Sequence, residues 1–323
     1  MHPVPPELRS GPFTRARARS LGVSDRMLDG RRFVRLLPTV FRHHDHVMSH
    51  AEWVEAAALA LPARAHPTGI TRIQLLGLDF GPRWPLRFVV EGDLHLAFDG
   101  VFLHRTRRLP PLDEVGVTPA AAYLAYCRRA RVVDAVKVGD WLLHRGHMSA
   151  QELRDLALAQ QWRDGADEAL WVLPHLDPES RSLPESESRV VLGFAGLPIG
   201  EGNRKLDLPD DVTVLSDLVF WQWRTVVEYE GGHHQEERAR YVSDIDRYAL
   251  LRRHDVGYVQ VTHEKLGRPR TLVGEVFREL VTRGYDGDPP EFGEQWRQLF
   301  MRVTHVLGPR RDRHARGGSP TVS

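Results

Sequence analysis

Acidic side chains gather between positions 217 and 230, in a segment that is otherwise rich in apolar residues. Asp217 lies near the end of one apolar run, and Glu228 and Glu230 lie two positions apart in the next. Because successive strand residues point to opposite faces, Glu228 and Glu230 are predicted to share a face. Carboxylates that converge at a sheet edge repel one another unless a cation lies between them, and oxygen ligands suit Mg²⁺ or Mn²⁺. The layout predicts metal-dependent phosphodiester hydrolysis, with Asp217, Glu228 and Glu230 as metal ligands.

The alternative interpretation is that these acids are solvated charges on an exposed hairpin. Leu215, Leu218, Phe220, Val226 and Val227 surround them and favour buried strands instead. A buried strand that carries acids is costly unless an ion compensates their charge. The flanking residues therefore favour a site.

Paired histidines follow these strands after a Gly-Gly turn. His234 lies six residues past Glu228, and an imidazole pKa of about 6.5 suits proton transfer at neutral pH. His234 is the candidate general acid or base, and a surface histidine is the alternative. Asp244 and Arg247 lie three apart on a predicted helix, so Arg247 either pairs with Asp244 or contacts a phosphate of DNA.

The order of these motifs resembles that of a bacterial family of uncharacterised proteins. The C-terminal domain of that family is similar to very-short-patch-repair (Vsr) endonucleases, within the PD-(D/E)xK nuclease superfamily. The resemblance covers roughly residues 183–283 and is carried by Glu185-Ser186 with Arg189, Ala195-Gly196-Leu197-Pro198, Asp217-Leu218, Glu228-Tyr229 with Gly231, His234, Asp244 with Arg247, and Val256-Gly257-Tyr258.

Helices are predicted over 185–195, 235–253 and 271–283, and strands over 212–220, 224–230 and 257–262, in the order αββαβα. The resemblance implies a restriction-endonuclease-like core of this order with a mixed sheet. It implies that Asp217 and Glu228 hold the metal ion and that Glu185 is an outer acid of the site. The alternative for Glu185 is a helix N-terminal acid favoured by the helix dipole. Glu230 occupies the position where many members of the superfamily carry a lysine, and His234 the position where the repair endonucleases carry a histidine.

Arginines dominate the first 45 residues, where nine of them face four acids and give the segment a charge of +5. Short helices are predicted over 14–21 and 25–29, and a strand pair over 33–37 and 40–41. This pattern is typical of a winged helix-turn-helix, in which Arg26, Arg31 and Arg32 would contact DNA phosphates. Residues 10–160 also resemble the N-terminal half of the same bacterial family, which is similar to AbiEi-type antitoxins and opens with a winged helix. A basic helical cap that binds nothing is the alternative.

A mixed and then α-rich region is predicted between the two ends of the chain. Ser49 and Glu52 form a capping-box pattern that opens a helix to Leu61. Strands are predicted over 70–78, 86–91 and 101–105, and helices over 119–126, 132–143 and 149–161. Asp140 and Trp141 are interpreted as packing or cap residues, and His43, His44, Asp45 and His46 as a solvated loop.

The sequence therefore predicts an α+β protein of several parts. These are a basic winged-helix module (1–48), a middle domain (49–176), a linker (177–184), a nuclease-like domain (185–300) and a basic disordered tail (301–323). The single cysteine, Cys127, excludes intrachain disulfides and thiolate zinc sites. No apolar run approaches the length of a membrane span, and a cytoplasmic protein is expected.

The leading functional hypothesis is a cytoplasmic, magnesium-dependent DNA endonuclease that its N-terminal module targets to DNA. The alternative is a DNA-binding regulator, or a type IV antitoxin-like protein with a protein partner from a toxin–antitoxin or defence system, in which the nuclease fold is catalytically silent. A membrane partner is not expected.

Overall fold

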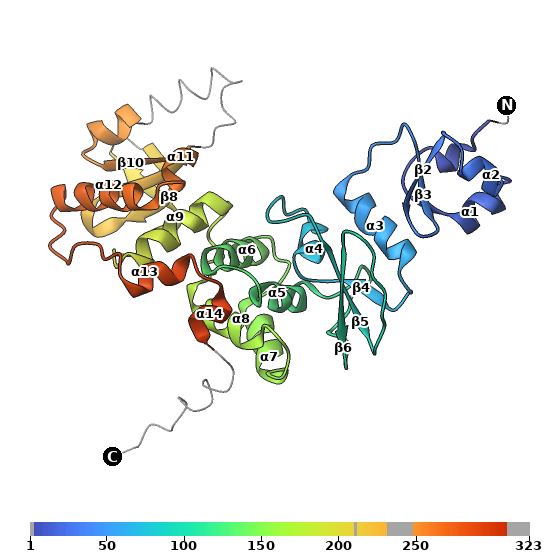
Figure 1. Cartoon of the computed structure of the whole chain (residues 1–323). Coiled ribbons are helices and arrows are strands. Elements are labelled where there is room, and N and C mark those ends of the chain that lie inside the picture. The colour runs from blue at the N-terminus through green and yellow to red at the C-terminus, as the bar shows by residue number, and fades with distance from the viewer. Residues whose placement is uncertain (1–2, 210–211, 231–247, 309–323) are drawn as a thin grey trace, which may run out of the picture. The chain divides into compact units, whose positions relative to one another are not determined.

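The computed structural model describes residues 3–209, 212–230 and 248–308, and the chain divides by its internal contacts into two units, Met1–Tyr126 and Cys127–Ser323 (Figure 1). Both units mix helices with strands. The division differs from the predicted linker, since residues 177–184 lie inside the second unit. Among the described residues, no helix has the length and apolar character to cross a membrane.

The N-terminal part of the first unit is built from short elements. They are η1 (Pro6–Leu8), β1 (Phe13–Thr14), α1 (Arg15–Ser20), α2 (Asp25–Leu28), β2 (Phe33–Leu37) and β3 (Val40–His43). Thr14 caps α1 by accepting a hydrogen bond from the Arg17 amide at 3.1 Å. The strands form an antiparallel sheet in the order β1-β3-β2. Phe13, Phe33 and Phe41 join the buried core that this sheet shares with both helices.

The rest of the first unit contains a second sheet. Its elements are α3 (His50–Ala60), β4 (Ala65–Pro67), α4 (Gly69–Gln74), β5 (Leu86–Glu91), β6 (Val101–Thr106) and α5 (Pro119–Cys127). The sheet has the order β4-β5-β6 and mixes antiparallel with parallel pairing. The capping box at Ser49 is confirmed, with Ser49 and Glu52 each accepting the other's backbone N–H.

The strand predicted over 70–78 is wrong, because residues 69–74 form helix α4. Its β-branched residues favour a strand locally. Tertiary contacts outweigh that preference: Ile70 and Ile73 are buried three apart on one helical face, and α4 packs against β5. The Thr71 hydroxyl also accepts a hydrogen bond from the Arg87 amide at 2.9 Å.

The helices of the second unit lie on both sides of its strands in sequence. They are α6 (Val132–His144), α7 (Ala150–Ala159), α8 (Ala166–Val172), η2 (Leu173–His175), α9 (Leu183–Phe194), α11 (His263–Leu266), α12 (Pro269–Thr282), α13 (Glu294–Leu299) and α14 (Val303–Leu307), with residues 248–253 also helical. Helix α14 corrects the predicted tail, which was expected to be disordered from residue 301. Buried Val303 anchors this helix, and residues 309–323 lie outside the described residues.

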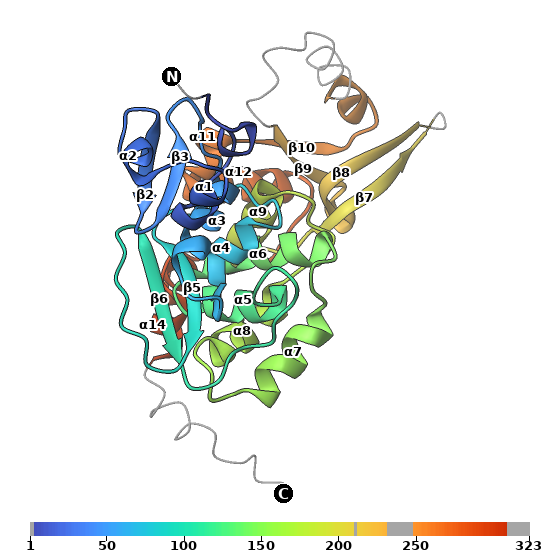
Figure 2. The ribbon, with the colours of Figure 1, turned by 90° about the vertical axis from the view of Figure 1, so that its right-hand side faces the viewer.

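A four-stranded mixed sheet forms the other part of the second unit. Its strands are β7 (Glu201–Leu208), β8 (Val212–Phe220), β9 (Thr225–Glu230) and β10 (Gly257–Thr262), with η3 (Trp221–Trp223) between β8 and β9. The order is β10-β9-β8-β7, with β10 parallel to β9 and the other pairs antiparallel. Figure 2 shows β7 and β8 as a long hairpin.

The predicted order αββαβα lacked strand β7. The side chains of Glu201, Arg204, Lys205 and Asp207 hide this strand, because they break the apolar alternation by which strands are recognised. Pairing with β8 makes it a strand. Helix α9 packs against β8 and β9, and α12 packs against β9 and β10. Part of the helix predicted over 235–253 lies outside the described residues.

Candidate active site

Asp217 of β8 and Glu228 of β9 lie opposite each other on neighbouring strands. The antiparallel pairing of β8 with β9 runs from Phe220↔Thr225 to Leu218↔Val227. One step further, Asp217 stands at the position opposite Glu228, where main-chain pairing ends. The Asp217 Oδ2 accepts a hydrogen bond from the Tyr229 amide at 2.8 Å. A carboxylate thus takes the place of a backbone acceptor at this point of the sheet.

Glu228 is buried, with a relative exposure of 9%. It follows buried Val226 and Val227 on β9, and its neighbour on β10 is Gln260. An ionised carboxylate in such surroundings requires compensation by hydrogen bonds or by a cation. The prediction that this strand is buried rather than a free hairpin is therefore confirmed for Glu228.

Glu230 lies on the same face as Glu228 but about 6.6 Å further along the strand, as expected from a rise of about 3.3 Å per residue. Both of its carboxylate oxygens accept hydrogen bonds: Oε1 from the Tyr258 hydroxyl at 2.8 Å, and Oε2 from the Gln260 amide. These two side chains of β10 hold Glu230 toward the β10 side of the sheet.

The three acids do not form a group in which all ligand atoms lie within 4.8 Å of one another. Within the described part of the chain, the group that does so is His43, His44 and Asp45. The structure therefore brings together Asp217 and Glu228 by register, and holds Glu230 apart with Tyr258 and Gln260.

Glu185 reaches this region from the first turn of α9. Ser182 caps the helix by accepting the Glu185 amide at 3.3 Å. The Glu185 Oε2 accepts hydrogen bonds from the Arg181 amide at 3.0 Å and from the Asn203 side-chain amide at 2.6 Å. Asn203 lies on β7 between the pairs Gly202↔Leu218 and Arg204↔Ser216, which places its backbone opposite Asp217. Glu185 is thus connected, through the side chain of Asn203, to the backbone position opposite Asp217.

A buried ion pair connects the same helix, α9, to α6. Asp140 of α6 is completely buried, and its Oδ2 accepts a hydrogen bond from Arg189 of α9 at 2.7 Å. Its Oδ1 accepts the Asp177 amide at 2.7 Å. Burial raises the pKa of the Asp140 carboxyl to about 6, even though the Arg189 guanidinium opposes that rise. Asp140 therefore joins α6 to α9 in addition to filling the core.

A cavity of about 940 Å³ opens next to Glu230. Tyr258, Gln260 and Lys265 line it together with Glu230. The Lys265 ammonium donates to the Gln260 carbonyl at 2.8 Å and pairs with Glu275 at 2.7 Å. A lysine is therefore present beside the strand that carries Gln260, although none occupies the position of Glu230 itself.

The predicted DNA-binding arginines lie on and after helix α2. Arg26 and Arg31 are exposed, and Arg32 is half-buried. Two other arginines of the segment, Arg15 and Arg19, pair with Asp25. Two of the nine arginines therefore join α1 to α2. The remaining predicted site residues, His234 and Arg247, lie outside the described residues.

The histidine loop is exposed at His44 and Asp45, as expected for a solvated loop, and hydrogen bonds hold its backbone. Arg42 donates to the carbonyls of residues 43, 44 and 46 at 2.7–2.9 Å, and His46 contacts Glu52 at 2.7 Å. His43 and His44 turn toward Asp45, at 3.8 and 2.9 Å. His46 instead faces Glu52 of α3.

Sequence reasoning missed Asn203, Gln260 and the Asp140–Arg189 pair. Asn203 lies on the strand that was not predicted, and nothing in its neighbourhood distinguishes it. Asp140 and Arg189 are 49 residues apart, so their contact depends on the packing of α6 against α9.

No family model matches the chain, and no curated protein matches it significantly. The resemblance to the repair-endonuclease family is therefore supported by the motif order alone.

Proposed function

We propose that the chain is a metal-dependent endonuclease that acts on DNA. Its active site would lie where the pairing of β8 with β9 ends, at Asp217 and Glu228, which we call the acidic edge. The observation that carries this proposal is the register of the two strands, which places Asp217 opposite Glu228 at the point where main-chain pairing ends. The hydrogen bond from the Tyr229 amide orients the Asp217 carboxylate there.

The side chains at this edge fit a hard divalent cation. Asp217 and buried Glu228 offer carboxylate oxygens, and so does Glu185, which Asn203 connects to this region. Carboxylate oxygens are the ligand type of Mg²⁺ or Mn²⁺. Asp217 and Glu228 would hold the ion, with Glu185 completing the acidic surroundings. When bound, such an ion polarises a scissile phosphate and lowers the pKa of an attacking water.

The spacing predicts that Glu230 is a metal ligand, but we propose a different role for it. Its two oxygens accept from Tyr258 and Gln260, so we assign it to the wall of the site and not to the metal. His234 remains the proposed proton-transfer residue.

The N-terminal elements support a DNA-binding role. Two short helices, a tight turn and a strand pair follow the order of a winged helix-turn-helix, whose second helix enters the DNA groove. Arg26 lies on that second helix, and Arg31 and Arg32 follow it. We propose that these arginines contact phosphates, that Arg247 contacts DNA in the second unit, and that the protein acts in the cytoplasm.

A second candidate function is DNA-binding regulation without hydrolysis, in the manner of an antitoxin with a protein partner from a toxin–antitoxin or defence system. The observation that favours it is the hydrogen-bonded Glu230 at the position where many members of the nuclease superfamily carry a lysine. In this alternative the acidic edge is a remnant of a nuclease fold.

Cleavage of supercoiled plasmid DNA in Mg²⁺, in Mn²⁺ and in EDTA separates the two candidates. Hydrolysis that needs the metal and disappears in Asp217→Asn supports the endonuclease. Retarded migration of uncut DNA in all three conditions supports the regulator.

A further inference from the structure

Glu185 depends on another side chain for its place near the acidic edge. The helix that carries it is separate from the sheet, and the contact that joins the two is made by Asn203 of β7. The Asn203 Nδ2 donates to the Glu185 Oε2 at 2.6 Å and to the Glu179 carbonyl at 2.7 Å. Both partners are acceptors, so the amide nitrogen and not the amide oxygen must face them.

The backbone at Asn203 is adapted to this contact. Its φ of 50° lies in the left-handed region, where asparagine is more easily accommodated than most residues. The pairs on either side, Gly202↔Leu218 and Arg204↔Ser216, are regular, whereas position 203 itself is skipped. The local turn of the chain directs the Asn203 side chain to α9 while its backbone stays opposite Asp217.

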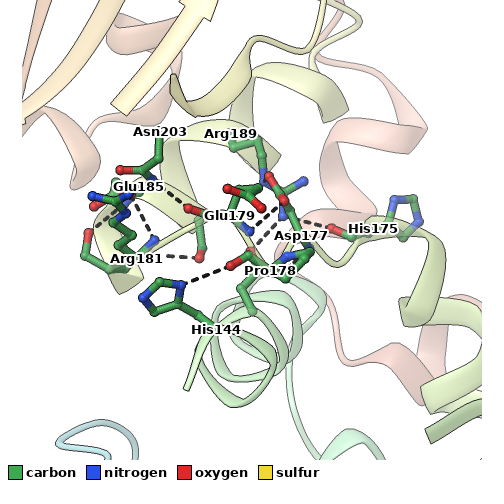
Figure 3. Close-up of polar contacts among 12 residues, drawn as sticks. His144, His175, Asp177, Pro178, Glu179, Arg181, Glu185, Arg189 and Asn203 are labelled. Carbon is green, nitrogen blue, oxygen red and sulfur yellow. Dashed lines mark hydrogen bonds and ion pairs between the residues drawn. The ribbon is translucent and has the colours of Figure 1, made fainter. Parts of the chain in front are cut away.

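The segment before α9, residues 177–182, makes the other half of this contact (Figure 3). It supplies the Glu179 carbonyl to Asn203 and the Arg181 amide to Glu185. The segment is itself anchored, because the Asp177 amide donates to Asp140 and the Arg189 guanidinium lies 3.6 Å from the Asp177 carboxylate. Asn203 therefore closes a contact between an anchored segment and β7.

We propose that Asn203 is a positioning residue, which sets the Glu185 carboxylate at the acidic edge and thereby the affinity of that edge for Mg²⁺ or Mn²⁺. This inference rests on the proposed function. Partners in the outer shell of a metal site change metal affinity by about 10- to 100-fold when they are removed. Asn203, only 8% exposed and bonded through both N–H groups, has the burial and the geometry of such a partner.

Substitution of Asn203 by glycine separates the contribution of the side chain from that of the backbone conformation. Glycine adopts a positive φ without strain, so Asn203→Gly removes the amide and leaves the turn of β7 in place. The exposed neighbour Arg204, which pairs with Glu201 at 3.1 Å, provides the matched control as Arg204→Ala.

The experiment is a titration of the full chain with Mn²⁺, followed by calorimetry or by the paramagnetic signal of the free ion. Asn203→Gly is expected to weaken Mn²⁺ binding at least about tenfold, and Arg204→Ala to leave it unchanged. In a Glu185→Gln background, Asn203→Gly should cause no further loss, because the side chain acts through Glu185. Melting temperatures in EDTA report any effect on folding separately.

The outcomes distinguish the inference from the proposed function. Loss of Mn²⁺ binding in Asp217→Asn together with wild-type binding in Asn203→Gly would overturn the positioning role and leave the metal site standing. Equal losses in the Glu185→Gln and wild-type backgrounds would also overturn it, since additivity means that Asn203 acts independently of Glu185. An absence of Mn²⁺ binding at the acidic edge in every variant and in the wild type would overturn both.

Discussion

Charge is organised in opposite ways in residues 1–45 and in the second unit. In residues 1–45 the arginines lie on short elements, and Arg26 and Arg31 extend into solvent. In the second unit, Asp140, Glu185 and Glu228 are buried and two of them have precise hydrogen-bond partners. Exposed charges act through their number and are screened by salt, whereas buried charges act through geometry.

This contrast has consequences for how each unit tolerates change. Losing one exposed arginine removes a share of a diffuse field. Losing one buried partner leaves an uncompensated charge in a medium of low polarity. Substitutions of the buried acids of the second unit should therefore have large, local effects, and substitutions of the exposed arginines of residues 1–45 should have small, cumulative ones.

The largest effect is expected at Asp217. Asp217→Asn keeps the shape of the side chain but removes the charge of a proposed metal ligand, so plasmid cleavage should fall by roughly 1,000-fold, or about 4 kcal/mol in the activation barrier. The fold should be unaffected, since removing one of two facing acids relieves repulsion. Cleavage rates at saturating Mg²⁺ and urea unfolding of both proteins check this. Wild-type cleavage by the variant would place the activity elsewhere.

The next effect concerns the buried pair of α6 and α9. Asp140→Ala leaves the Arg189 guanidinium buried without its main partner, and such losses cost about 3–5 kcal/mol. Arg131→Ala is the matched control, because it breaks an ion pair with Asp134 whose arginine is exposed, and such pairs contribute less than about 1 kcal/mol. Urea unfolding measures both. Similar losses in the two variants would contradict the distinction between buried and exposed charge.

The same carboxyl predicts a dependence of stability on pH. The folded-state pKa of Asp140, about 6, lies above the ordinary value of 3.8, so between these values the native state binds more protons than the unfolded state. Stability from this group is complete below about pH 4 and is lost as the pH rises through 6, by at most about 3 kcal/mol. Asp140→Asn should remove this part of the pH profile. A variant profile parallel to that of the wild type from pH 4 to 7 would contradict it.

The strands that carry the acids could be predicted from the sequence, whereas their pairing register could not. Strands β8, β9 and β10 were predicted because their apolar residues alternate or cluster, and the two-residue period placed Glu228 and Glu230 on one face. That period cannot tell which of the two stands opposite Asp217, because register is a property of strand pairing.

The parts that could not be predicted depend on contacts between distant segments. Strand β7 lacks an apolar pattern and is formed by pairing with β8. The role of Asn203 follows from β7, from a left-handed backbone and from the approach of α9, none of which leaves a local signal. Asp140 reads as an ordinary helical acid until Arg189 is placed against it.

The smallest effects are expected among the N-terminal arginines. Each phosphate contact that is lost should lower the slope of log affinity against log salt by about 0.9. If Arg26, Arg31 and Arg32 contact phosphates, the triple alanine variant should bind a DNA duplex more weakly at low salt and with a visibly flatter salt dependence. Fluorescence anisotropy over a range of NaCl concentrations measures both quantities.

The matched control removes the same charge from elsewhere in the first unit, by alanine at the exposed arginines Arg64, Arg107 and Arg108. If the field of the whole protein attracts DNA, both triple variants lose equal affinity and slope. If the second short helix and the residues after it form the contact, only the first variant does. Metal-dependent cleavage at high protein concentration should persist in both, because the proposed active site in the second unit contains none of these side chains. Equal slopes in all three proteins would show that the N-terminal elements are a structural cap, and DNA contact would then belong to the second unit.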